Sequence, residues 1–213
     1  MKNNLIMKKL LALSIVIALL SSCGGSSGSS GSKSNDLTPD ETPTVAVNSH
    51  DAVDLGLSVM WATCNIGAAT PYQNGDYFVN GGVVPMSGGE LSSYDFQDTA
   101  SANWGEPWRM PTLDEMKELL ELKHGLTTIN GVKGMQFTGA NGNSIFLPCA
   151  GTRSWTLEDV GRYGGYWTSN QFREGFITRG NYLFFSDIVE NGSITDGVNV
   201  LGLPVRPVCP VQQ

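Results

Sequence analysis

Residues 104–124 read WGEPWRMPTLDEMKELLELKH, and this stretch contains the clearest helix signal in the chain. Thr112 and Glu115 form a Thr-x-x-Glu pattern, the capping box, in which each side chain accepts a hydrogen bond from a backbone N–H of the first turn. Gly125 is a residue type that commonly ends a helix, and Lys123 and His124 suit its negative end. The sequence therefore predicts a helix over about 112–124.

The apolar residues of this helix recur at spacings of three and four and so share one face: Leu113, Met116, Leu119 and Leu120. The charged residues fall elsewhere around the helix. Trp104 and Trp108 add two large anchors just before it. We expect this face and the two tryptophans to form the core against which the rest of the chain packs.

Outside this helix the sequence predicts short strands joined by tight turns. Asn141-Gly142 and Asn191-Gly192 each indicate a hairpin, because an Asn-Gly pair supplies the positive φ angles of a tight reversal. We expect strands over 59–64, 134–138, 144–148, 182–188 and 194–195, a loop-rich insert over 71–93 and a short helical turn over 98–102. One main helix among short antiparallel strands corresponds to an α+β fold.

The N-terminus has the pattern of a bacterial lipoprotein signal. Lys2, Lys8 and Lys9 precede an apolar run over 10–20 that is too short to span a membrane but suits a secretory signal. Leu20-Ser21-Ser22-Cys23 has the form of a lipobox, which predicts that 1–22 is removed and that Cys23 is acylated. An ordinary signal peptide with an incidental cysteine is the alternative.

A lipid on Cys23 would hold the protein on a membrane without any membrane-spanning helix. We therefore expect it in the bacterial cell envelope, at the outer membrane, and the sequence leaves open whether it faces the periplasm or the outside. Residues 24–34 are almost wholly Gly and Ser, so we interpret 23–51 as a flexible tether. The remaining 52–213 has the length of a single domain.

The mature protein is strongly acidic. Removal of 1–22 takes three of the thirteen basic residues and none of the twenty acidic ones, which leaves a formal charge of −10. A nucleic-acid partner is not expected for such a chain, because phosphate backbones bind basic surfaces.

Six motifs occur in order along the chain: VDLGLSVMWATCNIG (53–67), GDY (75–77), WGEPWRMPTLDE (104–115), GANGNSIFLP (139–148), GYWTS (165–169) and VRPV (205–208). Together they resemble the Fibrobacter succinogenes major paralogous domain, a family found mainly in surface lipoproteins of Bacteroides-type bacteria. The resemblance covers about 52–209. The Arg-Met-Pro-Thr-x-x-Glu run is also similar to one in the formylglycine-generating-enzyme group, which implies a C-type-lectin-like fold with long loops.

Three cysteines remain besides Cys23, so at most one disulfide can form within the domain. Cys64 matches a position where the family often carries cysteine, whereas Cys149 and Cys209 depart from the family's pattern. The resemblance therefore favours a Cys149–Cys209 bridge. Three buried thiols are the alternative.

The sequence lacks the motifs of most catalytic or metal sites. His50 lies in the expected tether and His124 at a helix end, and there is no Cys-x-x-Cys pair, EF-hand loop, Gly-x-Ser-x-Gly elbow or phosphate loop. We expect no metal and no cofactor. Formylglycine-generating enzymes need two cysteines near the C-terminal end, where this chain has only Cys209, so their activity is not carried over.

The segment between Trp155 and Asn199 combines aromatic residues, amides and an arginine on turns and strand ends. Trp167, within GYWTS, is expected to be buried. We hypothesise that Tyr163, Asn170, Phe172 and Arg173 contact a ligand, since aromatic faces beside amides and Arg bind sugars or protein epitopes. C-type-lectin-like relatives commonly bind through the corresponding loops.

These observations favour a lipid-anchored binding or adhesion module for an unknown glycan or protein. An enzyme similar to the formylglycine-generating group is the alternative in a different functional class. A third interpretation is an accessory subunit of a surface fibre.

Overall fold

The computed structural model describes residues 37–87 and 96–212. The signal peptide, Cys23, the first part of the tether and the end of the insert predicted over 71–93 lie outside the described residues. Strands hold 41% of the described residues and helices 9%. The fold is therefore β-rich, with curled antiparallel sheets, and the predicted α+β class with a C-type-lectin-like fold is wrong.

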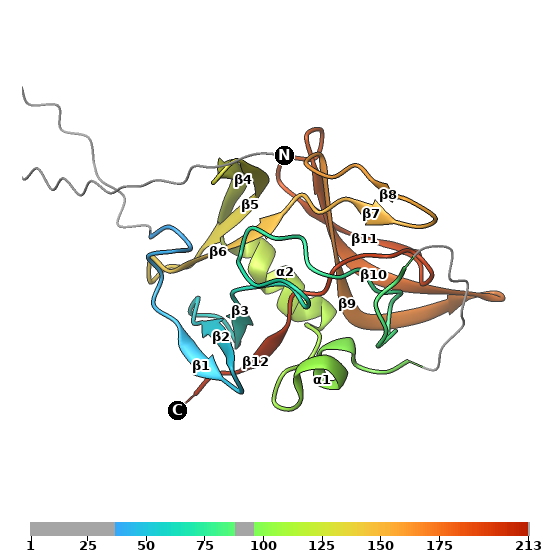
Figure 1. Ribbon diagram of the computed structural model, residues 1–213, viewed down its shortest axis with the longest axis horizontal. Coiled ribbons are helices and arrows are strands. Elements are labelled where there is room, and N and C mark those ends of the chain that lie inside the picture. Colours follow the sequence, from blue (N-terminus) through green and yellow to red (C-terminus); the bar gives the residue numbers. More distant parts are fainter. Residues whose placement is uncertain (1–36, 88–95, 213) are drawn as a thin grey trace, which may run out of the picture. The chain divides into compact units, whose positions relative to one another are not determined.

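The described part contains two helices and four antiparallel sheets (Figure 1). The helices are α1 (Thr99–Trp104) and α2 (Leu113–Glu121). One sheet has the order β1-β2-β3-β12, with β1 (Val45–Val47), β2 (His50–Val53), β3 (Val59–Ala62) and β12 (Val208–Pro210). Another has the order β4-β5-β6, with β4 (Lys123–Ile129), β5 (Val132–Thr138) and β6 (Ser144–Pro148).

The third sheet has the order β11-β10-β9, with β9 (Tyr163–Glu174), β10 (Ile177–Ser186) and β11 (Ser193–Val198). A small pair joins β7 (Thr152–Arg153) to β8 (Leu157–Glu158). Figure 1 shows α2 between the β4–β6 sheet and the β9–β11 sheet. Neither described helix is long and apolar enough to cross a membrane.

Helix α2 begins as predicted and ends earlier. Thr112 Oγ1 accepts from Glu115 N at 3.2 Å, and Glu115 Oε2 accepts from Thr112 N at 2.8 Å, so the capping box is confirmed. The helix ends at Glu121, and Lys123 already begins β4. The prediction that Lys123 and His124 belong to the last turn was wrong, because pairing with β5 along seven residues outweighs the local helical pattern.

The Arg-Met-Pro-Thr-x-x-Glu run forms one hydrogen-bonded unit. Arg109 Nη1 donates to Glu115 Oε2 at 2.8 Å and to Met110 O at 3.2 Å, and Arg109 Nη2 donates to Glu115 Oε1. Burial raises the pKa of Glu115, but the hydrogen bonds from Arg109 and Thr112 outweigh it and hold that pKa below its usual value. The motif therefore fixes how the chain enters α2.

The main core lies between α2 and three of the sheets. Helix α2 contributes Met116 and Leu119, both fully buried, while Leu120 is only partly buried at the margin of the core. The strands supply Val59 and Trp61 (β3), Met135 and Phe137 (β5), Ile145 and Leu147 (β6), Tyr166 (β9), Leu183 and Phe185 (β10) and Val208 (β12). The buried face of α2 is therefore centred on Met116 and Leu119, and Leu120 lies at its margin.

The two tryptophans before α2 belong to other parts of the interior. Trp108 is fully buried in a separate cluster beneath β2 and β3, and its Nε1 donates to Val47 O at 3.0 Å. Trp104 is partly buried and stacks on His50 at 3.7 Å between ring centroids. Because β1 and β2 pack here, the folded part begins before residue 52, where the tether was expected to end.

Both Asn-Gly hairpins are confirmed. Gly142 (φ 85°) lies in the turn between β5 and β6, and Gly192 (φ 66°) lies in the turn between β10 and β11. The sequence did not predict β4 or the long β9–β10 hairpin, which turns at Gly175 (φ 61°). The glycine-rich start and polar end of β9 lack the alternation that marks a strand.

The core assignment predicts a difference between two neighbouring leucines. Leu119→Ala should reduce the free energy of unfolding by about 2–5 kcal/mol, because it leaves a cavity in a closed core. The matched variant Leu120→Ala should cost clearly less, since that side chain already meets solvent. Urea unfolding of both variants measures the difference, and equal losses would contradict the assignment.

Candidate functional site

The four predicted ligand-contact residues do not converge in one site. Tyr163 begins β9 opposite Ser186, whereas Phe172 lies opposite Arg179 near the far end of the same strand. At about 3.3 Å per residue, these two positions are about 30 Å apart along the strand. A single small-molecule site cannot include both side chains.

Two of the four residues have structural contacts instead. The Tyr163 ring packs against the Phe184 ring at 5.0 Å between centroids, and burial raises the pKa of its hydroxyl. Asn170 Oδ1 accepts from Leu113 N at 2.7 Å and so satisfies a backbone donor at the start of α2. Tyr163 is therefore part of the packing, and Asn170 positions the helix.

Phe172 and Arg173 are exposed as expected, but they point to opposite faces of the hairpin. Neighbouring residues of a strand alternate between the two faces of a sheet. Phe172 lies directly opposite Arg179, which in turn lies opposite Val198 of β11. Phe172, Arg179 and Val198 therefore share one face, and Arg173 lies on the other.

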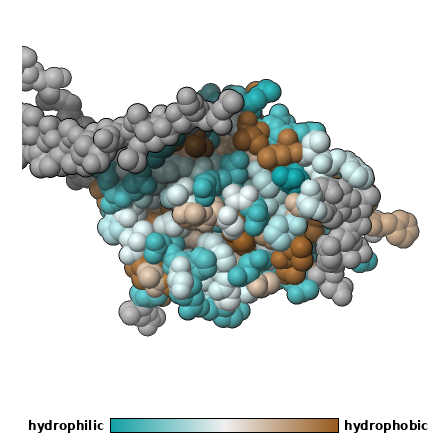
Figure 2. Space-filling view, viewed as in Figure 1, coloured by the Kyte–Doolittle hydropathy of each residue, from teal (hydrophilic) through white to brown (hydrophobic). Residues whose placement is uncertain are grey.

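An exposed apolar cluster forms around this end of the β9–β10 hairpin. It consists of four side chains, here named the tip patch: Phe172, Phe176, Ile177 and Val198. Phe176 is wholly exposed, while Phe172 is 42% and Ile177 51% exposed. Figure 1 shows the hairpin extending beyond the neighbouring elements, and Figure 2 shows apolar colouring at the end of this projection. Sequence reasoning missed Phe176, although a phenylalanine after a turn glycine is a usable signal.

Ion pairs connect the three strands on the same face as Phe172 and Val198. Arg179 Nε donates to Asp196 Oδ2, and Arg179 Nη1 lies 3.6 Å from Glu174 Oε2. These contacts connect β10 to both of its neighbours, and the hydrogen bond to Asp196 is the main reason that the pKa of Arg179 is raised. The patch therefore sits on three cross-linked strands.

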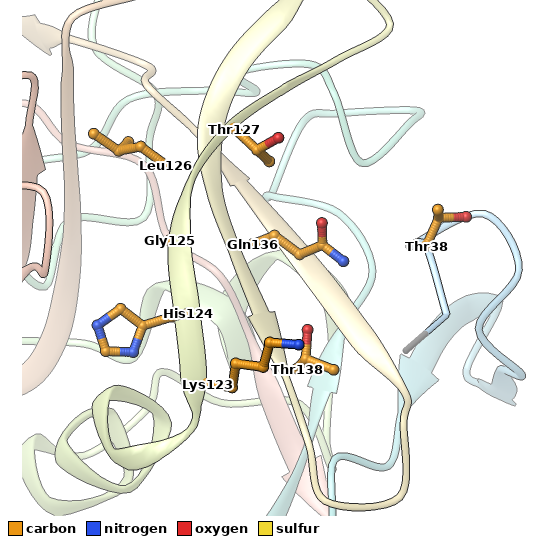
Figure 3. Close-up of a pocket in the computed structure, with 8 residues that line it drawn as sticks. All are labelled: Thr38, Lys123, His124, Gly125, Leu126, Thr127, Gln136 and Thr138. Carbon is orange, nitrogen blue, oxygen red and sulfur yellow. The ribbon is translucent and has the colours of Figure 1, made fainter. Parts of the chain in front are cut away.

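A polar trough of about 410 Å³ lies over the outer face of β4 and β5 (Figure 3). Its lining is Thr38, Lys123, His124, Gly125, Leu126, Thr127, Gln136 and Thr138. Gly125 leaves space above the sheet, since a Cβ there would have no neighbour within 4 Å. The His124 and Leu126 side chains point away from the other lining side chains. The trough thus offers hydroxyls, one amide and one ammonium group, without an aromatic ring.

Two smaller recesses lie near the start of β9. One, of about 140 Å³, lies between Tyr163, Phe184 and the turn after β10, and the other, of about 400 Å³, reaches the buried thiol of Cys149. Lys133 pairs with Asp187 between them. Neither recess gathers residues with a clear chemical role.

The predicted disulfide is not formed. Cys64, Cys149 and Cys209 are free, and Cys149 and Cys209 are buried in different core clusters. Burial raises the pKa of both buried thiols to about 11, which keeps them protonated at neutral pH. The prediction failed because a shared departure from the family's pattern carries no information on which cysteines meet in space.

The two histidines also have structural partners. His50 stacks on Trp104, and burial lowers its pKa. His124 places Nδ1 2.7 Å from Leu122 O and Nε2 2.7 Å from Asn191 O. Within residues 37–87 and 96–212, there is no group of three or more His, Cys, Asp or Glu side chains that could hold a metal ion.

We take the tip patch as the candidate functional site for two reasons. It gathers large apolar side chains that are exposed, and it includes Phe172, which the sequence analysis had proposed as a ligand contact. The trough on β4 and β5 is a second feature of the surface, polar rather than apolar. Comparisons with protein-family models, curated proteins and solved structures found no match.

Proposed function

We propose that this protein is a binding or adhesion module of the bacterial cell envelope, anchored by a lipid on Cys23, and that the tip patch contacts a protein partner. The observation that carries the proposal is the complete exposure of Phe176 at the end of a hairpin whose strands are fixed by pairing and by the Arg179 ion pairs. Exposed apolar side chains that gather in one patch often mark a site of interaction with another protein.

The energetic argument follows from the area that a partner would cover. A buried phenylalanine removes about 150–250 Å² from water. Fully burying a phenylalanine side chain contributes roughly 1.5–3 kcal/mol before the costs of association are subtracted. Phe176 together with Phe172 and Ile177 therefore has the character of a binding hot spot.

The shape of the surface favours a protein over a sugar. Sugar sites are concave and combine an aromatic face with several convergent polar groups. The tip patch projects from the hairpin, and Arg173 lies on the opposite face from Phe172. A projecting apolar group fits a pocket on a protein partner better than it fits a glycan.

The anchoring part of the proposal rests on the lipobox and on where the described chain begins. Leu37 N donates to Gly142 O at 2.8 Å, and Ser144 Oγ donates to Leu37 O at 2.6 Å, so the chain is fixed to the β5–β6 hairpin from Leu37 onward. Between Cys23 and this point there are about fourteen residues, which span on the order of 20 Å on average if flexible.

The anchor is tested by removing its attachment residue. Cys23→Ala should abolish incorporation of a fatty-acid probe and leave the protein unprocessed or in the soluble fraction, because it removes the thiol to which the lipid is attached. Labelling and fractionation of cells measure both effects. Unchanged fatty-acid labelling of the variant would contradict the proposal.

The contact surface is tested with a polar replacement at the tip. The protein is screened against a panel of purified envelope and extracellular proteins and a glycan array, and any binding is measured again for Phe176→Ser. We expect a loss of at least tenfold in affinity, equivalent to about 1.4 kcal/mol. The unfolding midpoint should stay nearly unchanged, because exposed side chains contribute little to stability.

Ile188→Ser is the matched control, since Ile188 is 90% exposed in the turn after β10 and is not part of the tip patch. This variant should bind like the unmodified protein. A Phe176→Ser variant that binds its protein partner normally would contradict the assignment of the site. Binding confined to glycans would contradict the class of partner.

A further inference from the structure

Strand β4 forms an open edge in the described part of the chain. It has seven residues and pairs only with β5. The outer edge of β9, by contrast, is covered: Ser169 N donates to Pro111 O at 2.8 Å and Trp167 N to Pro204 O at 3.3 Å. No such backbone hydrogen bond covers β4 within the ranges described. An uncovered edge strand is a template for pairing with another chain.

The backbone groups that face outward can be identified from the neighbouring ladder. Cys149 N donates to Lys133 O at 2.8 Å, so odd-numbered residues of β5 direct their backbone groups toward β6 and even-numbered residues toward β4. The register pairs these even-numbered residues with odd-numbered residues of β4. His124, Leu126 and Thr128 therefore present their N–H and C=O groups at the open edge.

The surroundings of β4 leave room for a strand. Successive side chains of a strand point to opposite faces, yet all the residues from Lys123 to Thr127 line the trough. The trough must therefore reach the strand's edge as well as its outer face. Figure 3 shows the Lys123 and Thr127 side chains on one side of β4 and the His124 and Leu126 side chains on the other.

We propose that a second copy of this chain pairs with β4 in antiparallel orientation, with the two-fold axis at Leu126. In this register Leu126 lies opposite the partner's Leu126, and His124 lies opposite the partner's Thr128. All three outward-facing residues then donate and accept hydrogen bonds across the interface. The two three-stranded sheets become one continuous sheet.

The strand is complementary to itself in this register. On the outer face Lys123 lies opposite the partner's Ile129, and Gly125 opposite the partner's Thr127. No like charges meet, which is the condition for a stable cross-strand pair. The sequence Leu-Thr-Thr-Ile at 126–129 is also rich in β-branched residues, which favour strand pairing.

The edge formed by β11 is less suited to this role. Strand β11 has Asp196 and Gly197 near its centre, two residue types that are depleted in strands. Asp196 is also engaged by Arg179 of the neighbouring strand. Of these two edges, β4 is therefore the one better suited to pairing.

The symmetry of the pair agrees with attachment to one membrane. A two-fold axis at a hydrogen-bonded antiparallel pair is perpendicular to the sheet, so the outer faces of both copies point the same way. Thr38, close to the start of the described chain, lines the trough on that outer face. Thr38 of both copies would thus lie on the same side of the continuous sheet, and confinement to a membrane would raise the effective concentration of the two copies.

Paired cysteines at the interface test the register in the full chain in cells. In the double variant Gly125→Cys/Thr127→Cys, the new thiol at position 125 of one copy lies opposite the new thiol at position 127 of the other copy. The Cα separation of about 4.5–5 Å suits a disulfide. A mild oxidant should convert it to a dimer at least about five times more completely than either single variant, in which the thiols are too far apart. Non-reducing gels measure the dimer.

A selective break in the edge completes the test. Thr128→Pro, added to the double variant, removes a backbone N–H that points outward from β4 and is not used by another strand of the same copy. The domain should therefore keep its unfolding midpoint, while the amount of cross-linked dimer should fall about tenfold. Thr128→Ala, which keeps the N–H, should cross-link normally. Equal cross-linking of single and double variants, or a cross-link that survives Thr128→Pro in a folded domain, would overturn the proposal.

Discussion

A buried arginine holds the central part of this structure together. Arg206 is fully buried, and its guanidinium donates to Asn65 Oδ1 at 2.8 Å, to Phe146 O at 2.9 Å, and to the carbonyls of Ala62 and Thr63. A buried charge is costly unless every donor is satisfied. Burial lowers the pKa of Arg206. Its hydrogen bonds to four oxygens, from two different sheets and a loop, offset part of the cost of burying the charge. The end of β3, the strand β6 and the chain entering β12 therefore depend on one side chain.

The parts of the fold that local sequence determines could be predicted. The capping box at Thr112 and the Asn-Gly turns rely on residues close together in the chain, and both are confirmed. The class of the fold could not be predicted, because β4 exists only through its pairing with β5. The role of Arg206 was also invisible in the Val-Arg-Pro-Val motif, since its acceptors lie up to 144 residues away.

The candidate site was predicted in part, for the same reason. Exposure of Phe172 follows from its place in a polar stretch near a turn. Tyr163 and Asn170 are also residue types that favour ligand contact. Tyr163 instead packs on Phe184, and Asn170 accepts a hydrogen bond from the start of α2, and both roles depend on distant elements. Phe176 was overlooked because Gly175 was not recognised as the turn of a hairpin, and without that turn an aromatic residue resembles a core residue. The tip patch and the open edge of β4 lie on different sheets, so partner binding and pairing with a second copy are separable.

The most direct test of this account is the stability of Arg206→Met, a replacement of similar length without a charge. Because it removes the donor to four buried oxygens, the variant should lose about 3–5 kcal/mol of unfolding free energy in urea. Such a loss would establish that the guanidinium organises the sheets around it. A variant that unfolds within about 0.5 kcal/mol of the unmodified protein would contradict this, and would show that apolar packing alone holds β3, β6 and β12 together.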